Sequence, residues 1–387
     1  MIYLDNASTT YIKPQPVYDA MYAAVKQGIG NPGRGANAVT MAAGRILADC
    51  RKEIGTLFNA DKSENVILKS SVTEALNTIL FGLLKPGDHV ISSVMEHNSV
   101  LRPLEHFRKK DMITYDLLSC DAQGKINLDE IPSLEKDRTR VVILSHVSNL
   151  TGTIQPVQEV RRKLKNKNIF IILDTAQSAG YIHTDMHTLD ADAIAFTGHK
   201  GLMGPQGTGG FILNDRINRE MSPVFTGGTG SDSLSLDQPL FLPDKFESGT
   251  ANLPGISGLH EGVRYINNIS IDIISKKLTG LSEYFLNRLN TMDAISLKGI
   301  TQASGRIPTF SLEFQQVDCS EAAFILESRY GIITRSGYHC APLAHKALGT
   351  EHSGSLRVSF GHYTTYEEID ALLVGLKYLN EVNYGRI

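Results

Sequence analysis

The sequence predicts an α/β protein in which a mostly parallel sheet is followed by a smaller α+β domain. From about residue 65, short apolar runs alternate with segments of helical periodicity, and after about residue 256 this alternation stops. The apolar runs are continuous, which is typical of strands buried on both faces of a parallel sheet with helices on each side. The chain has 387 residues, enough for two domains with sizeable cores.

The first part of the chain supplies the sheet. Apolar residues at helical spacing predict a helix over 73–84, and similar segments at 100–110 and 157–166 lie between later strands. The predicted strands are residues 65–70, 89–97, 140–148, 169–177, 191–199 and 208–213.

The second part has a different texture. One long helical stretch covers 259–291, and the runs 295–300 and 307–314 alternate between polar and apolar residues as half-buried strands do. A helix, a loop, a strand and a last helix follow at 320–331, 332–354, 355–360 and 366–379. We therefore expect a large domain over 15–255 and a small α+β domain formed by 1–14 together with 256–387.

Composition excludes several classes of protein. The formal charge is −3, from 38 basic and 41 acidic residues, so neither nucleic acid nor a membrane surface is indicated as a partner. The N-terminus has no basic and apolar leader, and no apolar run approaches the roughly 18 residues that a bilayer requires. The four cysteines form no CxxC pair, which argues against zinc and disulfides. We expect a soluble, cytoplasmic protein.

Two strand ends carry groups suited to a flat anionic ligand. In "LKSSVTEA", Val72 and Thr73 open a helix, with Thr73 as a plausible cap, and free amides there suit a phosphate. An ordinary capped helix is the alternative. His97 ends the next strand, where an imidazole can stack on a ring or move a proton. A lone histidine is more often simply hydrogen-bonded.

Two further strand ends carry an acid and an amine. Asp174 follows four apolar residues, so it needs a cationic partner, and a protonated pyridine nitrogen would serve. A helix N-cap is the alternative interpretation. Most lysines are solvated surface charges, but Lys200 stands in "AFTGHKGLMGP" among small residues at a strand mouth, where a desolvated amine can form a Schiff base. Thr197 and His199 can add to the phosphate site. The glycines of "GPQGTGG" precede a strand, which excludes a dinucleotide fingerprint.

A phosphate cup, a ring-stacking histidine, a ring-nitrogen acid and an aldehyde-binding lysine together indicate pyridoxal 5′-phosphate. From "YLDNASTT" to "RVSFGHY" the chain resembles the class V aminotransferase-fold cysteine desulfurases. "TRSGYHCAP" is similar to the group II branch, which includes SUF-type desulfurases and selenocysteine lyases and reads Arg-x-Gly-His-His-Cys-Ala. Tyr338 replaces the first histidine of that pattern. The resemblance implies a fold type I, pyridoxal-phosphate-dependent transferase with a seven-stranded sheet.

The resemblance also implies a role for each matching residue. Lys200, Cys340 and His97 would be catalytic, and Thr250 would reach the phosphate of the other subunit, which implies a homodimer with shared sites. The implied cofactor contacts are Val72, Thr73, His97, Asn149, Asp174, Gln177, Thr197, His199, Lys200 and Thr250. The implied substrate contacts are Arg357, which holds the carboxylate, with Arg335, Asn6 and Arg34. No metal is implied.

The resemblance predicts conversion of L-cysteine to L-alanine with a persulfide on Cys340, which would supply iron–sulfur cluster assembly or a thiolation pathway. His339 is expected to favour the thiolate, the nucleophilic form. Buried, inert thiols are the commoner state of free cysteine. A lyase for selenocysteine or another sulfur amino acid stays open, and so does an aminotransferase, whose chemistry does not need Cys340. A scaffold without turnover is disfavoured by the intact set of residues. The segment 227–250 departs from the SUF-type hairpin, which leaves the sulfur acceptor open.

Overall fold

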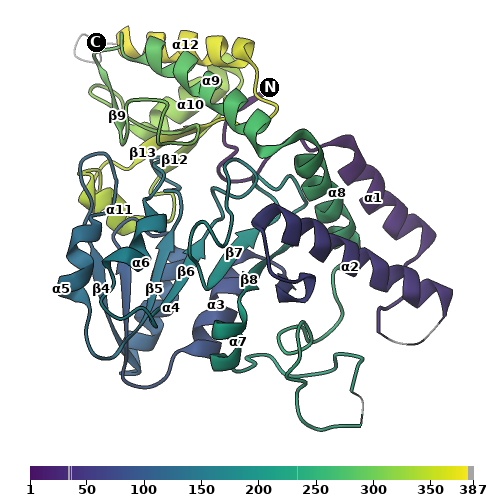
Figure 1. The fold of residues 1–387 in the computed structure, drawn as a ribbon. Helices are drawn as coiled ribbons and strands as arrows, with labels where there is room; N and C mark the ends of the chain where they lie inside the picture. The colour runs from purple at the N-terminus through teal and green to yellow at the C-terminus, as the bar shows by residue number, and fades with distance from the viewer. Residues whose placement is uncertain (34, 36, 233, 382–387) are drawn as a thin grey trace.

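The larger of the sheets has seven strands with helices on both faces (Figure 1). The computed structural model describes residues 1–33, 35, 37–232 and 234–381. Among the described strands of this sheet, β8 alone runs in the direction opposite to the other six. In spatial order the strands are β2 (Val66–Lys69), β8 (Gly209–Leu213), β7 (Ala193–Thr197), β6 (Phe170–Asp174), β5 (Thr139–Ser145), β3 (Asp88–Ser93) and β4 (Ile113–Leu118).

The strands are continuously apolar because successive residues enter different cores. Val141 and Ile143 belong to the cluster beneath α3 (Val72–Leu83) and α4 (Asn98–Lys109), whereas Val142 belongs to the cluster that includes α2 (Ala38–Phe58) and α8 (Leu253–Ile269). Both faces of the sheet are thus withdrawn from water, as predicted. Shorter elements on the way are η1 (Ser63–Asn65), η2 (Leu128–Glu130), α5 (Ile131–Leu134) and α7 (Asp215–Glu220).

A second, antiparallel sheet is built from the C-terminal part of the chain. Its order is β12 (Arg335–Gly337), β13 (Ser355–Ser359), β10 (Thr309–Phe314) and β9 (Ile295–Lys298). Beside it, β1 (Ile2–Tyr3) pairs in parallel with β11 (Ile332–Ile333), so the N-terminus lies against the C-terminal part. The helices of this part are α9 (Ile271–Leu289), α10 (Cys319–Tyr330) and α12 (Tyr366–Glu381), at the top of Figure 1, and the short α11 (Pro342–Ala347), which lies lower, at the left of the view.

Two predicted elements differ from the structure, and three elements of the structure were not predicted. The stretch 259–291 is two helices, α8 and α9, because Ser270 adopts φ 83° and its side chain caps α9. The crossover helix over 157–166 is reduced to η3 (Val157–Glu159) and α6 (Val160–Lys163). The edge strand β4 and the helices α1 (Gln15–Gln27) and α2 were not delimited from the sequence. The residues of β4 are largely accessible, so the strand lacks the continuous apolar signature.

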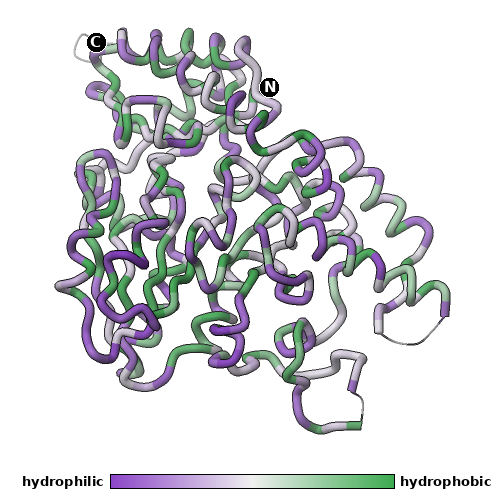
Figure 2. Tube along the Cα trace, viewed as in Figure 1, coloured by the Kyte–Doolittle hydropathy of each residue, from purple (hydrophilic) through white to green (hydrophobic). Residues whose placement is uncertain are grey.

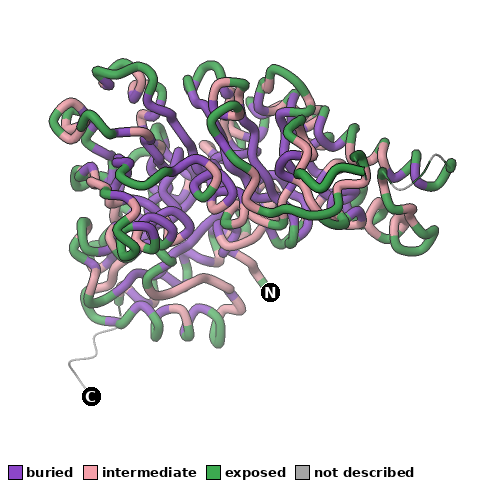
Figure 3. The backbone as a smooth tube through the Cα atoms, turned by 90° about the horizontal axis from the view of Figure 1, so that it is seen from below, coloured by how far each residue is buried: buried purple, intermediate pink, exposed green. Residues whose placement is uncertain are grey.

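Burial follows hydropathy in the helices and strands. Hydropathy alternates along α12 (Figure 2), whose Ile369, Leu372 and Leu376 are buried. Buried segments fill the middle of the molecule, and exposed segments are mostly peripheral loops and helix faces (Figure 3). Within the described ranges, no helix is long and apolar enough to cross a bilayer. Between α7 and α8 a long loop extends away from the sheet (Figure 1), and its Leu234 and Leu236 are fully exposed.

Candidate active site

Lys200 stands in a tight turn directly after β7. A Cβ atom added at Gly201 would lie 2.2 Å from the carbonyl oxygen of Ala179, and one at Gly180 would lie 2.2 Å from that of Gly201. The two turns after β6 and β7 therefore pack backbone to backbone, which only glycine permits. The hydroxyl of Thr10 donates to the carbonyl of Lys200 at 2.7 Å and fixes the turn from the N-terminal segment. The small residues of this stretch hold the lysine at the strand mouth.

The amine of Lys200 is desolvated. Burial is the main cause that lowers its pKa to about 8, the charge of Arg357 lowers it further, and Asp174 opposes the shift. Among the described residues, none forms a hydrogen bond or ion pair with Nζ. A neutral, unpaired amine is a competent nucleophile and base near neutral pH.

Asp174 ends β6, beside the lysine turn, and is buried. Its Oδ1 accepts a hydrogen bond from the amide of Ala176 at 2.9 Å, and its Oδ2 accepts one from the hydroxyl of Ser99 at 3.3 Å. Burial raises the pKa of this carboxyl, and no described residue supplies a cation within ion-pair distance. Turns rather than a helix follow residue 174, so the N-cap interpretation is wrong. The carboxylate remains available for a cation from outside the chain.

His97 is the N-cap of α4. Its Nδ1 accepts a hydrogen bond from the amide of Ser99 at 3.0 Å, and the hydroxyl of Ser99 reaches Asp174. Burial, together with the positive charge of Lys200, lowers the pKa of His97 to about 4. The imidazole is therefore neutral at physiological pH, as a ring that stacks on a flat ligand should be.

The predicted phosphate cup contains unused donors. The cap of α3 is Ser71, not Thr73 as the sequence suggested, because the hydroxyl of Ser71 accepts from the amide of Glu74 at 3.2 Å. Within the described part of the chain, the amides of Val72 and Thr73 have no hydrogen-bond partner. A helix N-terminus with two free amides attracts an anion. Thr197, another residue of the predicted cup, ends β7.

His199, next to the lysine, also has a buried polar atom without a hydrogen-bond partner. Its Nδ1 is buried and has no partner, and burial lowers the pKa of the ring to about 4. A buried polar nitrogen is costly unless it is hydrogen-bonded. This nitrogen, the unpaired carboxylate of Asp174 and the desolvated amine of Lys200 are polar groups without partners among the described residues, and together they fit pyridoxal phosphate.

The two predicted carboxamides are engaged with the protein. Nε2 of Gln177 donates to the carbonyl of Ala7 at 3.1 Å, and Nδ2 of Asn149 donates to the carbonyl of His339 at 2.7 Å. Both residues are buried at the ends of large-sheet strands, as expected, but they also tie other segments to that edge.

Arg357 is buried on β13 and makes contacts that sequence reasoning missed. Its NH2 donates to Oδ1 of Asp5 at 2.7 Å and to the hydroxyl of Ser8 at 2.7 Å. The same hydroxyl accepts from Arg335 at 3.1 Å, so Ser8 joins the two arginines. Nε of Arg357 is buried without a partner. Asn6 lies alongside, with its amide on the carbonyls of Tyr3 and Ser359 rather than on a substrate position.

Cys340 is exposed, and its sulfur lies 3.8 Å from NH2 of Arg335. The expectation that His339 would favour the thiolate is wrong. That ring is buried with Nε2 3.1 Å from the carbonyl of Ser355, and burial, together with the charge of Arg357, lowers its pKa to about 2. The positive charge beside the sulfur therefore comes from Arg335, through tertiary structure.

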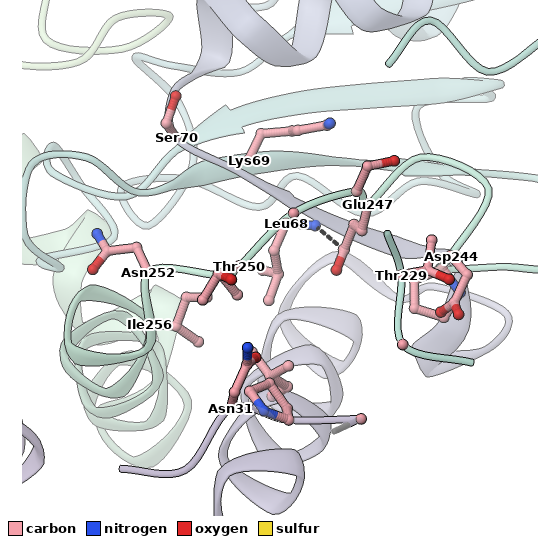
Figure 4. A pocket seen from close by; sticks show the side chains of 18 of the residues that line it. Asn31, Leu68, Lys69, Ser70, Thr229, Asp244, Glu247, Thr250, Asn252 and Ile256 are labelled. Carbon is pink, nitrogen blue, oxygen red and sulfur yellow. Dashed lines mark hydrogen bonds between the residues drawn. The ribbon is translucent and has the colours of Figure 1, made fainter. Parts of the chain in front are cut away.

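Thr250 lines a cavity of about 500 Å³ with Ser70, which directly precedes the α3 cap Ser71, and Asn252 at the start of α8 (Figure 4). Glu247 in the same wall accepts from the amide of Leu68 at 2.6 Å. None of the described lysine-site residues lines this cavity. Arg34 lies outside the described residues.

The desolvated lysine, the buried acid and the free amides at the start of α3 fit the amine, carboxylate and phosphate contacts that pyridoxal phosphate requires. Residues 2–372 match the aminotransferase class-V family, and the chain belongs to this family. Membership implies pyridoxal phosphate as cofactor.

Several curated relatives are named cysteine desulfurase or probable cysteine desulfurase. A "Probable cysteine desulfurase" of Methanothermobacter thermautotrophicus is 34% identical over 375 residues, which cover 96% of this chain and 92% of that protein. Another "Probable cysteine desulfurase", from Halalkalibacterium halodurans, is 31% identical over 98% of this chain and 93% of its own length.

Solved structures agree with the fold. The apo structure of cysteine desulfurase from Thermococcus onnurineus superposes with a TM-score of 0.91 at 30% identity, covering 98% of this chain and 94% of that one. The cysteine desulfurase CsdA from Escherichia coli, in an S-sulfonic acid form, gives 0.87 at 27% identity, covering 97% and 94%.

Proposed function

We propose that the protein is a pyridoxal-phosphate-dependent L-cysteine desulfurase that forms L-alanine and leaves a persulfide on Cys340. One observation carries this proposal beyond the relatives' names. The exposed thiol of Cys340 stands beside Arg335, and Ser8 connects Arg335 to Arg357. A thiol 3.8 Å from one guanidinium group, which a shared hydroxyl links to a second and buried one, suits a substrate that carries both a carboxylate and a sulfur atom.

Val72, Thr73, Thr197 and His199 would hold the phosphate, and Asp174 would pair with the ring nitrogen. His97 would stack on the ring. When bound, the cofactor supplies an electron sink for negative charge on the substrate carbons.

The chain's own residues perform the remaining tasks. Arg357 binds the substrate carboxylate. The neutral Nζ of Lys200 takes the α-proton and later returns a proton to carbon. The thiolate of Cys340 forms an S–S bond with the substrate sulfur, while the Cβ–S bond breaks and its electron pair stays on carbon. The net reaction converts L-cysteine and one enzyme thiol into L-alanine and one enzyme persulfide.

The finer assignments rest on the resemblance and on surface features. We assign the enzyme to the group II branch, with a large domain at 15–255 and a small domain at 1–14 and 256–387. The chain forms a homodimer that shares its sites, which is supported by the exposed Leu234 and Leu236 and by Thr250, which lines a cavity that Lys200 of the same chain does not line. The persulfide passes to an acceptor for iron–sulfur or thiolation chemistry. All four cysteines are free thiols, which suits the reducing cytoplasm.

The test is alanine formation from L-cysteine by the cofactor-loaded protein, with and without a reducing thiol. We expect alanine from the native protein, none from Lys200→Ala, and a retained cofactor band without sulfide release from Cys340→Ala. Sulfide release by Cys340→Ala at the native rate would show that another nucleophile acts. If the cofactor is bound to Lys200 but no alanine forms, L-cysteine is not the substrate, and selenocysteine or an amino-donor and keto-acid pair should be tested.

A further inference from the structure

The turn that carries Cys340 is held in an unfavourable backbone conformation. His339 and Cys340 have φ of 48° and 58°, the left-handed region, and neither is glycine. The Cβ atom of an L-residue disfavours this region, so two such residues in succession persist only when their surroundings impose them. The contacts of this turn show what imposes the conformation.

The carbonyl groups of both residues are bound from the large sheet. The amide of Asn98, the first residue of α4, donates to the carbonyl of Cys340 at 2.8 Å. The side chain of Asn149, in the loop after β5, donates to the carbonyl of His339 at 2.7 Å. Asn149 is buried, so its hydrogen bond is shielded from competing water.

Asn149 also contacts the arginine of the site. Its own carbonyl accepts from NH1 of Arg357 at 3.0 Å. One residue therefore touches the backbone of the cysteine turn through its side chain and the substrate arginine through its main chain. Substitution of the side chain leaves the carbonyl that Arg357 uses in place.

We propose that Asn149 is a positioning residue whose carboxamide holds the left-handed turn of Cys340 so that the sulfur points at the substrate sulfur. This inference rests on the proposed function. It gives Asn149 a task beyond the ring-edge contact implied by the resemblance, because Nδ2 donates one hydrogen to the carbonyl of His339. Attack of sulfur on sulfur requires close alignment, and a displacement of about 1 Å can slow such a step on the order of 100-fold.

The experiment uses the cofactor-loaded protein with Asn149→Ala and with Asn149→Asp, which keeps the shape but replaces the donor by an acceptor. Ser148→Ala is the matched control, because Ser148 is buried in the same loop and, among the described residues, its hydroxyl accepts only from the amides of Leu150 and Thr151. Three quantities are measured: hydrogen exchange of the backbone over 336–342, the cysteine-induced change of the cofactor band, and persulfide formation in a single turnover.

For both Asn149 variants we expect exchange over 336–342 to be faster by about tenfold or more, as loss of one buried hydrogen bond predicts. The band change with cysteine should persist, and persulfide formation should slow by about 10- to 100-fold. Ser148→Ala should leave exchange of this turn and persulfide formation unchanged. Native exchange and persulfide rates in both Asn149 variants would overturn the inference. Loss of the cofactor band with no change in exchange would also overturn the inference, since Asn149 would then contact the cofactor ring instead of holding the turn. If the native protein forms no persulfide, the proposed function fails. Faster exchange over 336–342 in the Asn149 variants would then still show that the side chain of Asn149 holds the turn.

Discussion

The lowered pKa of Lys200 should make its rate of reaction with the cofactor reach a plateau at a lower pH than the rate of an exposed lysine does. Burial brings the pKa to about 8 from the ordinary 10.5. At pH 7.5 about a quarter of such amines are neutral, against about one in a thousand of ordinary lysines. Since only the neutral amine attacks an aldehyde, Lys200 should react roughly 200-fold faster than an exposed lysine of equal intrinsic reactivity.

The assay mixes cofactor-free protein with pyridoxal phosphate between pH 7 and 10 and follows the growth of the visible band. Between pH 7 and pH 8 the neutral fraction of the amine rises from about a tenth to about a half, so the rate should rise about fivefold. From about pH 9 upwards the rate should level off, because the amine is then almost entirely neutral. Borohydride reduction and peptide mass mapping then locate the modified lysine. Free Nα-acetyl-lysine is the control, and its rate should keep rising beyond pH 9.

A protein rate that rises without a plateau up to pH 10 would show that Lys200 is solvated, and the argument from burial would fail. Modification at another lysine with an intact plateau would refute the assignment of the residue while leaving the reasoning on desolvation intact.

Three other substitutions test the packing and electrostatics of the lysine site and of the neighbouring cavity that Glu247 lines. Asp174→Asn should weaken cofactor binding at least about tenfold, yet leave the cofactor-free protein no less stable in thermal unfolding, because it removes a buried charge without a cation; a clear loss of apo stability would contradict this. Gly201→Ala should cost about 1–3 kcal/mol or more in chemical denaturation, because the new Cβ meets the carbonyl of Ala179 at 2.2 Å; native stability would refute the backbone contact. Glu247→Gln should cost up to about 3–5 kcal/mol, since it leaves the buried guanidinium of Arg51 without its carboxylate partner at 2.7 Å; a denaturation midpoint equal to the native one would show that this pair contributes little.

Local sequence was most informative about candidate site residues that lie at the end of a strand. Asp174 and Lys200 follow continuous apolar runs, and the carboxyl ends of parallel strands meet at one edge of a sheet. The order of strands along the chain was therefore enough to bring these groups together. Capping was less certain, because Ser71 and Thr73 are both good caps and only the backbone geometry selects Ser71.

The sequence by itself determined the fold class, and it predicted the candidate cofactor-site residues and the candidate cysteine, because these predictions depend on hydrophobic periodicity and on local motifs. Tertiary structure alone decided the environment of the thiol and of Arg357. Asp5 and Ser8 meet Arg357 from the opposite end of the chain, and the ring of His339 turns into the protein while Arg335 faces the sulfur. The physical reason is that charge and desolvation depend on distance in space, which neighbours along the chain do not fix.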